Sequence, residues 1–150
     1  MLLVAGCGHG LAPPGPTGVQ GRITFLGTWP SNTDFVAVAL FPYEPTADDP
    51  VLPLAWQTMD AMPPGSVFDY NLSVPGGSYG FLVVAWIEQG SNIFDFDSWV
   101  ILAFHADPEA PSQPGEVVVI TGLIRRIDLT ADLNLVPSTM HAIAAVPGGP

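Results

Sequence analysis

The sequence contains no lysine, and its only strong cations are three arginines, Arg22, Arg125 and Arg126. They stand against 14 acidic residues, so the formal net charge is -11. Proteins bind nucleic acids largely through cationic side chains that displace counterions from the phosphates, so this composition excludes DNA and RNA as partners. It equally excludes attachment to anionic lipid through a basic patch.

Long apolar segments are also missing. No stretch approaches the roughly 20 residues that a membrane-spanning helix requires, and apolar residues nowhere recur at helical spacing over a helical length. A chain of 150 residues that is 48% hydrophobic can nevertheless build one domain with a substantial core. Any attachment to a membrane must therefore come from another feature of the chain.

Cysteine occurs once, at Cys7, which excludes a disulfide within the chain. Cys7 ends the run Leu3-Val4-Ala5-Gly6-Cys7, in which two small residues precede the thiol. This run resembles the lipobox at which bacterial signal peptidases cut lipoprotein precursors. The resemblance implies that Cys7 carries lipid and holds the protein to a bacterial membrane outside the cytoplasm. The alternative is a buried free cysteine in an apolar N-terminal strand.

Proline and glycine divide the chain into regions. Residues 1–7 are interpreted as a partial lipoprotein signal with its lipobox, and the Pro-rich and Gly-rich residues 8–18 as a stiff, unfolded tether. A β domain is expected over residues 19–136. Residues 137–150, which end in Pro-Gly-Gly-Pro, are expected to form a flexible tail.

Short apolar runs between turn residues predict an all-β fold, a seven- to eight-stranded antiparallel β-sandwich. Pro75-Gly76-Gly77 predicts a tight hairpin turn, because glycines tolerate the backbone angles that such a turn needs. The proline-rich residues 106–115 are expected to link two sheets. The predicted strands cover residues 19–26, 35–43, 54–59, 67–74, 79–88, 99–104, 116–121 and 124–135.

Two of these strands, 67–74 and 124–135, alternate between apolar and polar residues, so each is expected to bury one face. In the last strand the residues expected to be buried are Ile127, Leu129, Ala131, Leu133 and Leu135. Two other strands, 35–41 and 79–87, are apolar on both faces. A two-layer sandwich buries only one face of each sheet, so their second face needs a cover. We expect the chain's own loop 44–65, with Leu52, Leu54 and Trp56, to supply it; the alternative is another protein.

The strand segments Gly21-Arg22-Ile23-Thr24-Phe25, Val36-Ala37-Val38-Ala39-Leu40-Phe41, Tyr70-Asn71-Leu72-Ser73-Val74-Pro75-Gly76-Gly77-Ser78-Tyr79 and Ile127-Asp128-Leu129-Thr130-Ala131-Asp132-Leu133 resemble those of prealbumin-like sandwiches. Such sandwiches occur as carboxypeptidase-regulatory-type domains on bacterial surface proteins and lipoproteins. The resemblance covers roughly residues 19–136. It implies a non-catalytic domain of some seven strands, acting as a structural or protein-interaction module of the cell envelope.

Histidine is scarce, which argues against an enzyme. A nucleophilic site of the serine or cysteine type needs a histidine beside the nucleophile. His9 lies in the predicted tether and His141 in the tail, so only His105 belongs to the β domain. We therefore expect no catalytic residues.

Ligand binding is the competing function. Asp95 and Asp97, near Asn92, would point to the same side of an extended segment and offer the oxygen ligands that calcium takes. The alternative is a solvated turn. The tryptophans could include a platform for stacking a carbohydrate, although packing inside the sandwich is the alternative; they are Trp29, Trp56, Trp86 and Trp99. No cofactor other than calcium is expected.

Overall fold

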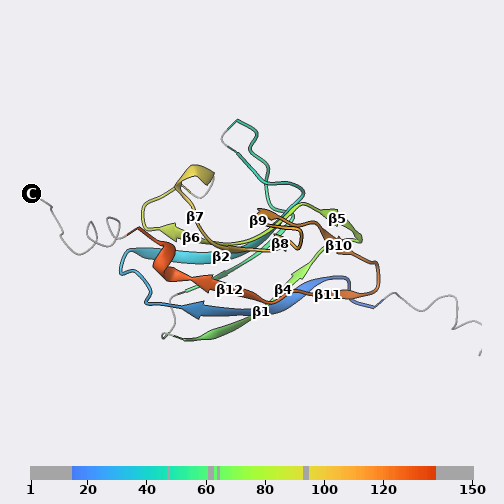
Figure 1. The fold of residues 1–150 in the computed structure, drawn as a ribbon, viewed down its shortest axis with the longest axis horizontal. Helices are drawn as coiled ribbons and strands as arrows, with labels where there is room; N and C mark the ends of the chain where they lie inside the picture. The colour runs from blue at the N-terminus through green and yellow to red at the C-terminus, as the bar shows by residue number, and fades with distance from the viewer. Residues whose placement is uncertain (1–14, 47, 61–62, 64, 93–94, 138–150) are drawn as a thin grey trace, which may run out of the picture.

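The computed structural model describes residues 15–46, 48–60, 63, 65–92 and 95–137, and these residues form an all-β domain. Two sheets lie face to face as the two layers of a sandwich (Figure 1). The predicted β-sandwich is therefore confirmed.

The first sheet is built around β1 (Gly18–Leu26). β4 (Val67–Ser73) pairs with β1 in the antiparallel sense on one side. On the other side β11 (Ile124–Arg126) and β12 (Leu129–Asp132) follow one another along β1, and both run parallel to it. The expectation of a wholly antiparallel sandwich is wrong at these two strands. A parallel pair needs a long crossover connection, and here the whole second sheet lies in the chain between β1 and β11.

The second sheet contains four antiparallel strands in the order β3 (Ala55–Met59), β2 (Thr33–Phe41), β6 (Phe81–Glu88) and β7 (Val100–Phe104). Its register places Val38 between Gln57 and Val84. The side chain of Gln57 also accepts a hydrogen bond from the backbone N–H of Asn71 in β4, at 3.1 Å, which ties the edges of the two sheets together.

Alternate residues of the strands form the core between the sheets, as the period of two along a strand requires. The largest fully buried side chains include Phe25, Leu40, Tyr70, Leu72, Leu82 and Trp86. The buried aromatic polar groups are paired: the Tyr70 hydroxyl donates to the carbonyl of Ile127 at 2.5 Å, and the Trp86 indole donates to the Thr33 hydroxyl at 2.6 Å. Burial, followed by the nearby carboxylate of Asp128, raises the pKa of Tyr70 well above its usual range.

The predicted strand 124–135 is wrong at its end. It divides into β11 and β12, and the chain then turns into a short 3-10 helix, η2 (Leu133–Leu135). The Asp132 carboxylate accepts a hydrogen bond from the Asn134 N–H at 2.9 Å and so caps this turn. The turn keeps Leu133 fully buried but leaves Leu135 54% exposed, so the alternation does not extend to Leu135.

The Pro75-Gly76-Gly77 turn does not close a hairpin. β4 pairs with β1, whereas β5 (Gly77–Tyr79) pairs with β10 (Val117–Val119), so the turn carries the chain away from the first sheet. The predicted strand 79–88 is interrupted at Gly80, whose N–H donates to the carbonyl of Pro42 at 2.9 Å.

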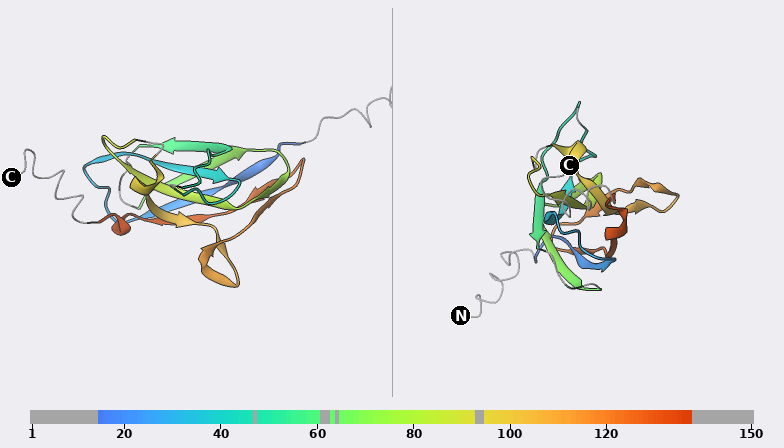
Figure 2. Two further views of the ribbon diagram at one scale, coloured as in Figure 1. Left: turned by 90° about the horizontal axis from the view of Figure 1, so that it is seen from above. Right: turned by 90° about the vertical axis from the view of Figure 1, so that its left-hand side faces the viewer.

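Residues 106–115, expected to be a plain link, form a small hairpin of β8 (Ala106–Asp107) and β9 (Ala110–Pro114). This hairpin projects from the sandwich (Figure 2, orange). Its base is closed by a hydrogen bond from the Gly115 N–H to the carbonyl of His105, at 2.8 Å.

Candidate binding pocket on the outer face of the second sheet

The outer face of the second sheet is apolar. On the outer face of β2 the two small side chains of Ala37 and Ala39 lie between the large side chains of Phe35 and Phe41. On β6 the outward residues are Phe81, Val83, Ala85 and Ile87, all buried. The prediction that this face needs a cover is therefore confirmed.

The cover over Phe41 comes from a turn that sequence reasoning treated as a calcium candidate. This turn contains the 3-10 helix η1 (Phe96–Ser98), followed by Trp99. Phe41 has its ring centroid 6.0 Å from that of Phe96 and 6.1 Å from that of Trp99, and the last two rings lie 4.9 Å apart in an edge-to-face arrangement. Figure 1 shows η1 and the β2–β3 loop on the same side of the second sheet, away from β1.

The loop that was expected to supply the cover contributes little of it. Within its described residues, Val51 packs against the cluster of Phe41 and Phe81. Leu52, Leu54 and Trp56, which were expected to lie over the sheet, remain 62%, 53% and 59% exposed. The second face is thus covered only in part, and the uncovered part is hollow.

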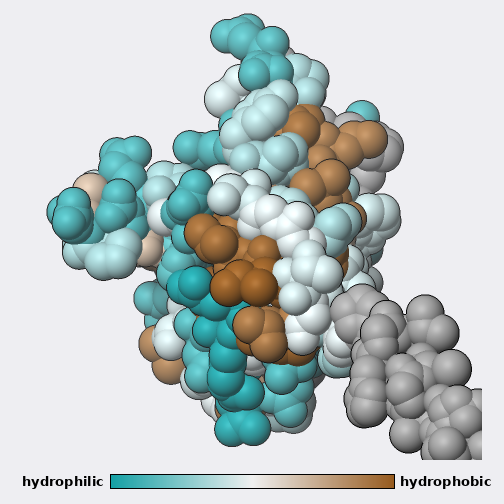
Figure 3. All heavy atoms as spheres, turned by 90° about the vertical axis from the view of Figure 1, so that its right-hand side faces the viewer, coloured by the Kyte–Doolittle hydropathy of each residue, from teal (hydrophilic) through white to brown (hydrophobic). Residues whose placement is uncertain are grey.

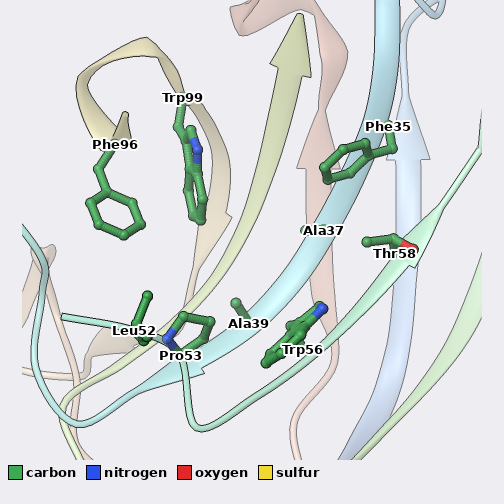
Figure 4. A pocket seen from close by; sticks show the side chains of 9 residues that line it. All are labelled: Phe35, Ala37, Ala39, Leu52, Pro53, Trp56, Thr58, Phe96 and Trp99. Carbon is green, nitrogen blue, oxygen red and sulfur yellow. The ribbon is translucent and has the colours of Figure 1, made fainter. Parts of the chain in front are cut away.

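This hollow is a pocket of about 280 Å³ between η1 and the edge strand β3. Figure 4 shows Phe96 and Trp99 on one side and Trp56 on the other, with Ala39 of β2 between them. Ala37 and Ala39 form the floor of the pocket, because their side chains are small and the neighbouring aromatic side chains extend further from the sheet. The lining residues are Phe35, Ala37, Ala39, Leu52, Pro53, Trp56, Thr58, Phe96 and Trp99.

The β2–β3 pairing explains how Trp56 reaches the pocket. Trp56 lies opposite Ala39 and Thr58 lies opposite Ala37, so both point to the outer face. The side-chain polar groups in the lining are the hydroxyl of Thr58 and the indole N–H groups of Trp56 and Trp99. Such a pocket can hold an apolar group and offers few hydrogen bonds to orient a polar one.

The four tryptophans fall into two classes. Trp86 is fully buried in the core, and Trp29 packs against Phe25 with ring centroids 5.0 Å apart. Trp56 and Trp99 line the pocket. Two indole rings therefore line one pocket, but carbohydrate recognition also needs several polar partners, and the pocket is poor in them. Carbohydrate binding remains a prediction.

Asp95 and Asp97 are both exposed, and their segment is not extended. Asp95 occupies the N-cap position of η1 and Asp97 lies inside it, so the two carboxylates do not alternate as they would along a strand. The Ser98 hydroxyl donates to the backbone carbonyl of Asp95 at 2.7 Å. Histidine, cysteine and carboxylate side chains nowhere gather in groups of three or more among the described residues. Calcium binding at Asp95 and Asp97 remains a prediction.

Cys7, His9 and His141 lie outside the described residues, so the lipidation site remains a prediction. His105 follows β7; its N–H donates to the carbonyl of Leu82 at 2.9 Å. Burial, followed by the charge of Arg125, lowers the pKa of His105. The described residues include no helix whose length and apolar character would let it traverse a bilayer.

On sequence grounds Trp56 and Trp99 were two of four candidate tryptophans, but it was not predicted that these two share a pocket. Phe96, Ala37 and Ala39 were given no role in a binding site. One signal was available: two alanines between two phenylalanines on the same strand face leave a hollow. Comparison of the chain with protein-family models, with curated proteins and with solved structures finds no match.

Proposed function

We propose that this protein is a non-catalytic protein-interaction module of a bacterial envelope, a prealbumin-like sandwich that is held to a membrane through lipid on Cys7. In this proposal the pocket between Trp56 and Trp99 is the docking site, and residues 8–17 serve as the tether between the lipid and the domain; Gly18, which was expected in the tether, is the first residue of β1. The observation that carries the proposal is the partly covered apolar face of the second sheet.

The apolar lining of the pocket supports a protein partner. At about 280 Å³ the pocket lies near the lower end of the roughly 300–1,000 Å³ that is typical of ligand sites, and its lining offers few polar side-chain groups, so it suits the large apolar side chains of a partner. Protein interfaces concentrate their binding energy in such anchors, which enter pockets rich in aromatic residues. The exposed side chains of Leu52 and Trp56 would extend the contact surface around the anchor.

Binding of carbohydrate or calcium is the alternative function. Two tryptophans in one pocket favour stacking on a sugar. A thermal-shift screen against calcium and a glycan panel tests both ligands. Calcium stabilisation that disappears in an Asp95→Asn, Asp97→Asn double variant, or glycan stabilisation that disappears in Trp56→Ser, would favour the alternative.

The experiment for the proposed function is selection of peptides from a random displayed library on the full-length protein. We expect the selected peptides to share a large apolar residue and to compete with one another. Trp56→Ser should weaken their binding by about tenfold or more, the loss typical of a central anchor contact. Because Trp56 is 59% exposed, this variant should fold normally, which thermal unfolding checks.

Val118→Ser is the matched control. Val118 is 43% exposed on β10, away from the pocket, at an end of the sandwich where Ile120 and Leu123 are also exposed. Figure 3 views this end and shows apolar side chains on its surface. Peptides that lose affinity equally in Val118→Ser and Trp56→Ser would overturn the proposed docking site, and so would a failure to select any peptide.

A further inference from the structure

Strong positive charge is confined to the first sheet, where carboxylates accompany it. The three arginines of the sequence all lie in the first sheet, Arg22 on β1 and Arg125 and Arg126 on β11. The two ion pairs of the described residues involve them: Arg22 with Asp69 at 3.0 Å, and Arg126 with Asp128 at 3.4 Å. Since the chain has no lysine, the second sheet and its loops contain no strong cation.

The elements that line the pocket carry carboxylates instead. Asp34 directly precedes the lining residue Phe35 on β2, and Asp60 directly follows the last residue of β3, two residues after the lining residue Thr58. Asp95 and Asp97 flank Phe96 in the turn that lines one side of the pocket. All four are exposed. Each of the four lies within two residues of a side chain that lines the pocket, and charges interact over a Debye length of about 8 Å at physiological ionic strength.

The aromatic lining of the pocket also favours a cationic partner. The ring faces of Trp56, Trp99 and Phe96 carry negative electrostatic potential, so they attract a cation placed over them. We propose that the partner segment is basic as well as apolar: a large apolar side chain enters the pocket, and lysine or arginine residues beside it face the carboxylates and aromatic rings. This inference rests on the proposed docking function and specifies the chemistry of its partner.

Other occupants fit the charge less well. A second copy of this chain would bring another net charge of -11 against the same carboxylates, and like charges facing one another disfavour a complex. An anionic lipid surface meets the same repulsion. A basic peptide gains from every carboxylate around the pocket, and this attraction should also speed its association at low salt.

The test uses three synthetic peptides with the same central Leu-Phe-Leu anchor and with flanks of lysine, serine or glutamate. Their binding to the full-length protein is measured by fluorescence anisotropy at low and at physiological salt. We expect the lysine peptide to bind about tenfold more tightly than the serine peptide at low salt, and the difference to shrink as salt screens the charges. The glutamate peptide should bind least, and Trp56→Ser should weaken the binding of all three.

Charge variants test whether the preference for the lysine peptide comes from the carboxylates beside the pocket. Asp95→Asn with Asp97→Asn removes two carboxylates beside the pocket, and Asp95 makes no side-chain capping bond that the change would break. Glu109→Gln with Glu116→Gln removes the same charge from exposed positions outside the pocket lining. The first pair should weaken binding of the lysine peptide several-fold and leave the serine peptide unchanged, whereas the second pair should leave both unchanged.

The outcomes separate the two proposals. Equal binding of all three peptides, lost together in Trp56→Ser, would overturn the basic partner and leave the docking site standing. Lysine-peptide binding that is unaffected by Trp56→Ser, or weakened equally by both charge pairs, would show general attraction to an acidic protein and overturn the inference. If none of the peptides bound, both this inference and the proposed docking function would be overturned.

Discussion

Truncation of Leu133 to alanine should destabilise the protein strongly, whereas the same change at Leu135 should not. Leu133 is fully buried in the core between the sheets, and Leu135 is 54% exposed, although both belong to η2. Leu133→Ala removes three carbon atoms, which at about 0.8 kcal/mol each is roughly 2.4 kcal/mol of lost transfer free energy. The cavity left behind raises the expected cost to about 3 kcal/mol.

That cost is a large part of the roughly 5–15 kcal/mol by which a domain of this kind is stable. With a urea dependence of about 1–3 kcal/mol per molar, the unfolding midpoint should fall by roughly 1–3 M in Leu133→Ala. Tryptophan fluorescence during urea unfolding provides the measurement. Leu135→Ala should move the midpoint by less than about 0.5 M, since surface substitutions usually change stability by about 0.5 kcal/mol or less. Equal losses at the two positions would mean that the strand continues through Leu135, and would refute the 3-10 turn and its capping by Asp132.

Three further predictions concern the anchor, the pH dependence and one close contact. Expressed behind a complete signal sequence in a host that processes lipoproteins, the protein should incorporate labelled palmitate and partition into detergent, and Cys7→Ser should abolish both; equal labelling of the variant would end the lipoprotein interpretation. The pKa of His105 is lower in the folded protein than in the unfolded chain, so as the pH falls through the ordinary value of 6.5 the unfolded chain binds the proton first. His105 should therefore destabilise the fold on acidification below that pH and have no such effect above it. Between neutral and mildly acidic pH, the urea midpoint should therefore fall less for His105→Gln than for the parent. A difference in midpoint between the two proteins that does not change with pH would contradict the lowered pKa of His105. Gly80→Ala places a methyl group 2.8 Å from the carbonyl oxygen of Pro42 and 3.2 Å from the Cα of Tyr43, both backbone atoms, so it should cost about 1–3 kcal/mol in urea unfolding; an unchanged midpoint would show that the β5–β6 junction can shift.

The period of two along the chain was sufficient to predict most strands and the inward residues of β4 and β12. It also predicted that β2 and β6 are apolar on both faces and that a further element must cover them. These features depend only on the local sequence, because successive side chains of a strand point to opposite faces in any strand, independently of its neighbours. The charge imbalance and the absence of lysine likewise belong to the sequence alone.

The tertiary structure decided which segments meet. Alternation is the same for parallel and antiparallel neighbours, so the sequence could not show that β11 and β12 run parallel to β1. The departure of Leu135 from the alternation has a local cause, the side-chain cap from Asp132 to the N–H of Asn134, which competes with continued strand pairing and which alternation alone does not reveal. The pocket exists because the register of β3 on β2 sets Trp56 opposite Ala39, while a turn more than 30 residues further along the chain brings Phe96 and Trp99 over the same face. Contacts of this kind join residues far apart in the sequence, and only the packing of the sheets determines them.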